Sequence, residues 1–286
     1  MCEEMKTGVS ALSDLISAHT GFILCFCTIL NFLESKKKIL DKIGKIYQKT
    51  GPSRGPPMPP SAPSIPEENM ATAKSRGANV IDSAPLALDA QVELMATAHA
   101  QGHHVARLHC GDPSLYGAIG EQIRRLEELD IDYEIIPGVM ATSASAAWLG
   151  KELTLSGVSQ TLIMTRYEGK TPFPERERLP ALAATGATLA IHLGVTRIHK
   201  IVEDLLPHYG EDCPVAVCYR TSWPDQDKVV GTLGDIVAKV REKKFTRTSL
   251  ILVGHVLDTD NFNDSYLYDE NKAHIYRKKD HNKKTV

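Results

Sequence analysis

The chain has 286 residues, of which 42% are hydrophobic and 24% charged, with a formal net charge of -2 and a pI near 6.6. This composition is typical of a soluble globular protein with room for one or two domains. The weakly acidic balance argues against a general binder of nucleic acid or of a membrane surface. The six cysteines show no CxxC pair and no zinc-type His/Cys spacing. We therefore expect no metal site and a reducing, cytoplasmic compartment.

Residues 1–75 differ from the rest of the chain. The apolar segment 21–33 is shorter than the roughly 20 residues that a membrane-spanning helix needs, so we expect a buried or partner-facing helix rather than a membrane anchor. The basic start of a signal peptide is missing. Lys36 to Ile46 have the spacing of an amphipathic helix, and the proline-dense segment 56–66 indicates an extended linker. We interpret 1–75 as an unrelated N-terminal extension with a Pro-rich linker.

The most informative stretch lies at residues 105–129. The apolar run 105–108 predicts a buried strand, Gly111-Asp112-Pro113 predicts a turn, and the apolar spacing from Leu115 to Leu129 predicts a helix. A strand, a turn and a helix in this order place the turn at the carboxyl edge of a sheet, where open α/β sheets bind small ligands. Asp112 either accepts hydrogen bonds from a ligand or caps the helix, and on these residues alone capping is favoured.

Strands and helices alternate along the remaining chain, which predicts a mixed α/β fold. We expect a first lobe at 76–156, a second lobe at 157–257 and a polar tail at 258–286. The expected strands are 79–82, 133–138, 161–166, 188–193, 214–219, 228–232 and 249–254. The expected helices are 87–100, 142–147, 198–206 and 235–243.

Single residues give few signs of chemistry. The GxSxG, Walker and HExxH motifs are absent. His103 and His104 are read as an exposed pair rather than a metal site, and His192 as a hydrogen-bonded histidine of an apolar strand. Cys110 and Cys218 fall in predicted strands, so we expect both to be small buried residues.

Several motifs, taken in order, resemble the tetrapyrrole (corrin/porphyrin) methyltransferases over about residues 78 to 277. They are His109-Cys-Gly-Asp-Pro-Ser-Leu-Tyr-Gly117, Ile136-Pro-Gly-Val139, Leu153-Thr154, Thr161-Leu-Ile-Met-Thr-Arg166, Tyr219-Arg-Thr-Ser-Trp-Pro-Asp225 and Leu250-Ile-Leu-Val-Gly254. The resemblance implies two α/β lobes with S-adenosylmethionine held in the cleft between them. It also implies methyl transfer by in-line displacement, in which the sulfonium supplies the electrophile and no catalytic nucleophile is expected.

The resemblance also implies which residues bind. The expected cofactor residues are Gly111, Asp112, Pro113, Ser114, Leu115, Thr142, Ser143, Ile191, His192, Tyr219, Leu250 and Leu252. Ile191 and the two strand leucines would equally be core residues in any α/β domain. A polycarboxylate substrate needs cations, and the candidates are Arg166, Lys170 and Arg220, each of which could instead be a solvated surface cation.

One feature of the family is missing. Its first strand ends in a GxGPGD loop, and residues 1–75 contain no such spacing. We therefore expect a two-lobed tetrapyrrole methylase fold with an incomplete first lobe.

The activity that the resemblance implies is S-adenosylmethionine-dependent methylation of precorrin-4 at C11 in cobalamin biosynthesis. The alternatives are a sister activity on another ring position and a non-catalytic remnant of the family. The oligomeric state stays open, with a homodimer among the alternatives.

Overall fold

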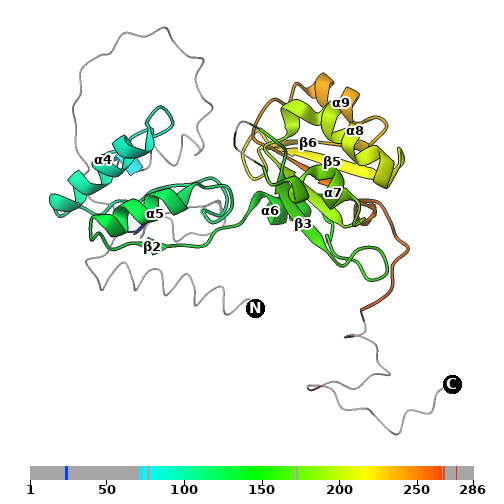
Figure 1. Ribbon diagram of the computed structural model, residues 1–286, viewed down its shortest axis with the longest axis horizontal. Helices are drawn as coiled ribbons and strands as arrows, with labels where there is room; N and C mark the ends of the chain where they lie inside the picture. The colour runs from blue at the N-terminus through cyan, green and yellow to red at the C-terminus, as the bar shows by residue number, and fades with distance from the viewer. Residues whose placement is uncertain are drawn as a thin grey trace. The chain divides into compact units, whose positions relative to one another are not determined.

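The computed structural model describes residues 23–24, 71, 73–75, 78–169, 171, 173–265, 267 and 275. The chain divides into two compact units, 1–140 and 141–286, and Figure 1 labels several of their helices and strands. We expected the change of lobe after residue 156, whereas this division falls after Met140. Helix α6 (Ala141–Leu149) belongs to the second unit because its Ala146, together with Leu153 and Leu155, packs on the sheet there.

In the part of the first unit from residue 78 onward, two helices pack together, and a short parallel strand pair also belongs to this unit. Helices α4 (Leu88–Ala100) and α5 (Ile119–Glu128) enclose a small apolar cluster and are joined on the surface by an ion pair between Asp89 and Arg125, at 3.0 Å. Strand β1 (Ile23–Leu24) pairs with β2 (Glu134–Ile135). The buried members of the cluster are Val92, Met95, Leu126 and Ile131.

Three predictions for the first unit are wrong. Ile23–Leu24 form a strand instead of part of a helix, because they find a partner in β2. Residues 79–82 form no strand, and 105–108 contain only a single bridge at Ala106, because a strand needs a neighbour over several residues. Helix α5 begins at Ile119 rather than near Leu115, because the backbone at Tyr116 and Ala118 is left-handed.

The second unit is built on a five-stranded sheet with the order β3-β4-β7-β5-β6. Strand β3 runs parallel to β4, β7 is antiparallel to both β4 and β5, and β6 is antiparallel to β5. All five predicted strands are confirmed, with ends that differ by at most one residue. Their bounds are β3 (Leu162–Arg166), β4 (Thr188–His192), β5 (Pro214–Tyr219), β6 (Asp227–Thr232) and β7 (Ser249–Val253).

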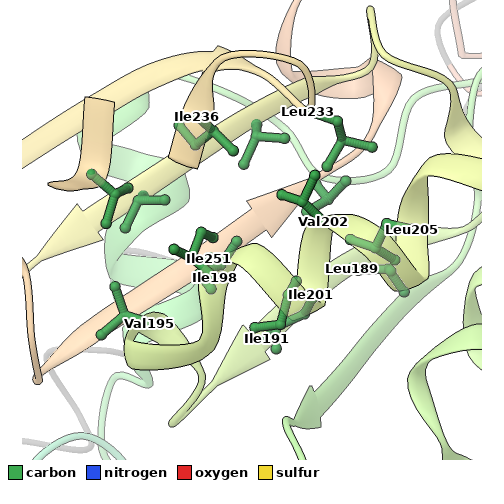
Figure 2. Packing of buried hydrophobic residues seen from close by; sticks show 14 of the residues in the cluster. Leu189, Ile191, Val195, Ile198, Ile201, Val202, Leu205, Leu233, Ile236 and Ile251 are labelled. Atoms are coloured by element: carbon green, nitrogen blue, oxygen red, sulfur yellow. The ribbon is translucent and has the colours of Figure 1, made fainter. Parts of the chain in front are cut away.

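The central strands of this sheet are apolar on both faces. Alternate residues point to opposite sides: Ile191, Val217 and Ile251 face the larger cluster, and Ala190, Ala216 and Leu252 the smaller. Helices α7 (Leu179–Ala183), α8 (Ile198–Tyr209) and α9 (Ile236–Lys243) cover the first side, and α6 packs on the second. Figure 2 shows α8 residues such as Ile201 and Leu205 beside Leu189 and Ile191.

Short elements complete the second unit. Short 3-10 turns lie at η2 (Glu175–Glu177), η3 (Val195–Arg197) and η4 (His255–Leu257). The predicted helices 198–206 and 235–243 correspond to α8 and α9, whereas α7 was not predicted. Cys218 is buried in β5 as expected, but the expectation for Cys110 is wrong, since it is exposed in a bend. Among the described residues, no helix combines the length and apolar character needed to span a bilayer.

Some predictions lie outside the described residues. These are the amphipathic helix at 36–46, the Pro-rich linker at 56–66, Lys170, and most of the tail beyond residue 265.

The packing of α8 gives the first testable prediction. Leu205 is fully buried against the sheet, so Leu205→Ala should lower the free energy of unfolding by about 2–5 kcal/mol through lost burial and a residual cavity. The matched control is Val230→Ala on β6, whose side chain is 52% exposed and whose truncation should cost less than about 1 kcal/mol. Denaturant unfolding followed by circular dichroism measures both, and equal losses would contradict the packing described.

Candidate functional site

The turn after His109 is tied to a second loop by one carboxylate. Asp112 accepts hydrogen bonds through Oδ1 from the amide of Ser114, at 2.9 Å, and from the Ser114 hydroxyl. Its Oδ2 accepts a hydrogen bond from the amide of Gly138, also at 2.9 Å. Asp112 therefore joins two loops that are 26 residues apart in sequence. It caps no helix, because α5 begins after Ala118 without a side-chain cap, and the capping interpretation is wrong.

The same turn is closed by glycine backbone. Gly111 has a φ of +81°, which favours glycine. A Cβ on Gly117 would lie 2.2 Å from the carbonyl oxygen of Pro113, so no larger residue fits without moving the turn. Pro113 is buried, Leu115 donates its amide to the Asp112 carbonyl at 3.2 Å, and Ser114 is exposed. The predicted residues 111–115 thus form one compact turn.

The hydrogen bonds to Asp112 set its charge. Burial alone would raise its pKa, but the bonds from the Ser114 hydroxyl, the Gly138 amide and the Ser114 amide together lower the pKa below the ordinary value. The carboxylate is therefore ionised at neutral pH, and it holds the two loops together through charge-assisted hydrogen bonds.

His109 precedes this turn and is neutral. Burial, with a smaller contribution from the nearby Arg107 charge, lowers the pKa of His109 to about 4. Its Nε2 atom is buried and makes no hydrogen bond to any residue in the described part of the chain. An orphaned polar atom two residues ahead of Gly111 is compatible with a ligand that completes the hydrogen bonding of this loop.

In the second unit, the sheet topology brings charged and polar residues to one edge. Because β7 is antiparallel to both β4 and β5, the strands β3, β4 and β5 all run in the same direction. Their carboxyl ends carry Arg166, His192 and Tyr219, and Arg220 follows directly. The predicted residues at these positions are therefore assembled at one edge, as expected for a ligand-binding edge of an α/β sheet.

His192 is the last residue of strand β4, and Leu193 follows it. The Nε2 atom of His192 lies 3.2 Å from the hydroxyl of Thr142 on α6, and burial lowers the pKa of His192, so the ring is neutral at neutral pH. This confirms the expected hydrogen-bonded histidine. Leu193, by contrast, is 72% exposed with a φ of +54°. The next residue, Gly194, has no space for a Cβ, which would lie 2.7 Å from Ile201 Cδ1.

The side chain of Arg220 at this edge is largely enclosed, with 17% of it exposed. Its guanidinium lies 4.0 Å from the centre of the Trp223 ring, and its Nε lies 3.1 Å from Oδ1 of Asp225. The turn that carries these residues is joined to α6 by a hydrogen bond of 3.0 Å between the Thr221 and Ser145 hydroxyls.

The other predicted residues are placed as follows. Ile191, Leu250 and Leu252 are buried in the sheet core, with at most 2% exposure, so they form the packing behind the edge. Ser143 is exposed on α6, and Arg166 lies 4.8 Å from the ring centre of Phe173.

The residues that hold other site residues in place cannot be identified from the sequence alone. Gly138, Trp223 and Asp225 occur in quoted motifs, yet nothing in the motifs says that they contact Asp112 or Arg220. The bond between Ser145 and Thr221 spans 76 residues, and spacing along the chain cannot predict such a pair. Leu193 was read as the end of a strand, and its exposure appears only in three dimensions.

The Asp112 contacts predict a titration that can be followed at a single atom. The amide resonance of Gly138 should shift with pH at a midpoint below 3.8, the ordinary pKa of Asp. Because the pKa is lowered in the folded state, the stability contributed by this carboxylate is present above the ordinary pKa and lost as pH falls through the lowered one. Asp112→Asn should abolish the titration, and Ser114→Ala should raise its midpoint. A midpoint unchanged by Ser114→Ala would contradict the assigned bonds.

Comparisons with known proteins agree with this architecture. The family model "Tetrapyrrole (Corrin/Porphyrin) Methylases" matches residues 37–237, and so begins ahead of the motifs quoted above. A Precorrin-4 C(11)-methyltransferase of Pseudomonas aeruginosa is 63% identical over 198 residues, which is 69% of this chain and 79% of the relative. A Cobalt-precorrin-4 C(11)-methyltransferase of Methanocaldococcus jannaschii is 47% identical over 218 residues, covering 76% of this chain and 84% of the relative.

A solved structure supports the same assignment. The X-ray structure of a cobalamin biosynthetic enzyme, cobalt precorrin-4 methyltransferase, superposes with a TM-score of 0.65 at 36% identity, covering 68% of this chain and 82% of that chain. The fold is therefore the α/β tetrapyrrole methylase fold, and the chain belongs to the tetrapyrrole (corrin/porphyrin) methylase family.

Proposed function

We propose that this protein is an S-adenosylmethionine-dependent methyltransferase that methylates precorrin-4 at C11 in cobalamin biosynthesis. The observation that carries the proposal is the 63% identity to the Pseudomonas aeruginosa Precorrin-4 C(11)-methyltransferase across 79% of that relative's length. The relative from Methanocaldococcus jannaschii is named for the cobalt form of the same substrate. The reaction that both names share is methyl transfer to C11 of the tetrapyrrole ring.

The proposed cofactor site uses the Asp112 turn, residues 111–115. The orphaned Nε2 of His109 and the exposed Ser114 supply groups for a polar ligand, and Gly111 allows close approach to the backbone. Asp112 acts mainly by keeping this turn against Gly138, because both of its oxygens are engaged. These features fit a ligand with many polar groups.

From the second unit, we assign Thr142, Ser143, His192 and Tyr219 to the cofactor, with Ile191, Leu250 and Leu252 as the packing behind them. Leu193 joins this set because it is an exposed apolar side chain at the end of β4. When bound, S-adenosylmethionine supplies a methyl group on a sulfonium, which is an electrophile by itself. The protein residues then need only to orient both reactants and exclude water.

The proposed substrate site uses Arg166, Lys170 and Arg220 to bind carboxylates of the macrocycle. Arg166 is the last residue of β3 and Arg220 directly follows β5, and these two strands are separated by β4 and β7. Three strand spacings place their backbones about 14 Å apart. A large substrate with several carboxylates can reach both, and planar guanidinium groups match carboxylates through paired hydrogen bonds. We also propose a cytoplasmic location, because the buried Cys213 and Cys218 are both thiols that form no disulfide.

A second candidate is a non-catalytic member of the family that still binds ligand. The observation that favours it is the absence of the GxGPGD spacing from residues 1–75. A methyl-transfer assay with precorrin-4 and labelled S-adenosylmethionine separates the two. Product methylated at C11 establishes the enzyme, whereas cofactor binding without turnover supports the alternative.

The cofactor assignment predicts the behaviour of Asp112 variants. Asp112→Ala should weaken S-adenosylhomocysteine binding about tenfold in isothermal calorimetry, because the loop loses a charge-assisted tie worth about 1.5–3 kcal/mol. The melting curve should keep a single cooperative transition. The matched control is Asp132→Ala, which removes an exposed carboxylate of the same unit. Equal affinity in Asp112→Ala and in the control would refute the assignment.

The substrate assignment predicts a selective kinetic effect. Arg166→Gln and Arg220→Gln should each raise KM for precorrin-4 about tenfold, through loss of a charged hydrogen bond worth about 1.5–3 kcal/mol. KM for S-adenosylmethionine should stay unchanged. Arg176→Gln, an exposed position on η2, serves as the control. A rise in KM for both reactants would point to disrupted folding of the edge instead of lost substrate contacts.

A further inference from the structure

We propose that Asp225 and Trp223 are positioning residues, which hold the Arg220 guanidinium so that its Nη edge binds one carboxylate of the substrate. This inference rests on the proposed function and goes beyond it, because it assigns roles to two residues that do not themselves need to touch the substrate. All three residues belong to the single turn between β5 and β6.

The side chain of Arg220 is largely enclosed by the protein. Only 17% of its side chain is exposed, although arginine side chains usually reach into solvent. The guanidinium lies over the ring of Trp223, at 4.0 Å, and near the ring of Tyr219, at 5.9 Å. Tyr219 in turn stacks on the buried Phe245, with ring centres 4.9 Å apart. An aromatic platform anchored in the core therefore fixes the plane of the cation.

Asp225 approaches the Arg220 guanidinium from its Nε side. Its Oδ1 lies 3.1 Å from Nε of Arg220, and the contact is ionic, because the Nε–H makes no well-directed hydrogen bond. Within the described part of the chain, the two Nη atoms donate no hydrogen bond. Asp225 thus balances the positive charge of Arg220 from the Nε side. The opposite edge of the guanidinium, which carries the two Nη atoms, is left for another hydrogen-bond acceptor. A carboxylate can accept two parallel hydrogen bonds from that edge.

The turn that carries Arg220 is held in one conformation by several hydrogen bonds. Arg220 and Ser222 both have left-handed backbones, with φ of +46° and +71°, a conformation that costs free energy in non-glycine residues. Several hydrogen bonds hold this conformation. The Arg220 amide donates to Thr248 O at 2.9 Å, the Trp223 amide to Arg220 O at 2.9 Å, and the Ser222 amide to Oε1 of Gln226 at 2.8 Å. Backbone strain retained by so many bonds is typical of a preorganised binding group.

The test is a double-mutant cycle on the full chain. Wild type, Asp225→Ala, Arg220→Ala and the double variant are compared by KM for precorrin-4 and KM for S-adenosylmethionine. Asp225→Ala should raise KM for precorrin-4 about tenfold and leave that for S-adenosylmethionine unchanged. If Asp225 acts only through Arg220, the double variant should match Arg220→Ala. A structural defect would instead change both constants.

Further variants test the contact with Trp223 and provide controls for the double-mutant cycle. Trp223→Phe keeps an aromatic face under the guanidinium and should retain most of the affinity, whereas Trp223→Leu should behave like Asp225→Ala. Asp225→Asn replaces Asp225→Ala if the latter fails to fold. Glu242→Ala, an exposed carboxylate on α9, is the matched control and should equal wild type.

The outcomes separate this inference from the proposed function. If wild type methylates precorrin-4 and the effects of Asp225→Ala and Arg220→Ala simply add, or Asp225→Ala equals the control, the positioning role is overturned while the function stands. If wild type shows no turnover, the same proteins are compared in equilibrium dialysis with uroporphyrin, a stable polycarboxylate tetrapyrrole. Weaker binding by Asp225→Ala and no further loss in the double variant support the positioning role. Equal binding by all four proteins overturns it.

Discussion

The sheet of the second unit is constrained by burial on both faces. Val215, Val217, Ile251 and Val253 face one cluster, Ala216, Leu250 and Leu252 face the other, and all are at most 2% exposed. A polar side chain in the middle of these strands would lose its hydration without gaining a partner. Charged and strongly polar groups can therefore appear only where these strands end. Arg166, His192 and Arg220 occupy such positions, so the location of the candidate site follows from the packing of the core.

The first unit depends more on polar contacts. Its described apolar cluster has four buried members, and such a small core cannot by itself fix every loop. Arg107 lies between the helices and bonds to the side chains of Gln91 and Gln122, at 3.2 Å each. In the same way, Asp112 connects its own loop to the loop that contains Gly138. A turn placed by hydrogen bonds can present its backbone to a ligand with little apolar packing beneath it.

The contrast between the units explains what the sequence could predict. Strands such as 214–219 are continuous apolar runs, because both faces of the sheet are covered, and their ends were predicted to within one residue. Residues 105–108 have a similar pattern, yet they form no strand, since strand formation depends on neighbours that the pattern does not contain. Helix α7 has only five residues and a proline near its start, which leaves too little periodicity to detect.

The candidate site was predictable as a set of positions but not as a set of contacts. The motif around Asp112 indicated a ligand-binding turn, whereas its bond to Gly138 depends on how two distant loops meet. Likewise, Arg220 was predicted as a candidate cation for substrate carboxylates, but the approach of Asp225 to Nε depends on left-handed backbone at Arg220 and Ser222. Local rules disfavour that conformation in both residues, so only the folded turn accounts for it.

The existing contacts of the candidate site residues limit the chemistry that these side chains can perform. Both oxygens of Asp112 accept hydrogen bonds, His192 is neutral and bonded to Thr142, and Arg220 is balanced by Asp225. Side chains committed in this way are poor nucleophiles, because each would have to break an existing contact before reacting. They are well suited to hold a ligand in a fixed orientation. Methyl transfer from a sulfonium requires only that the protein hold the reactants in this way, since the donor brings its own electrophilic carbon and its own leaving group.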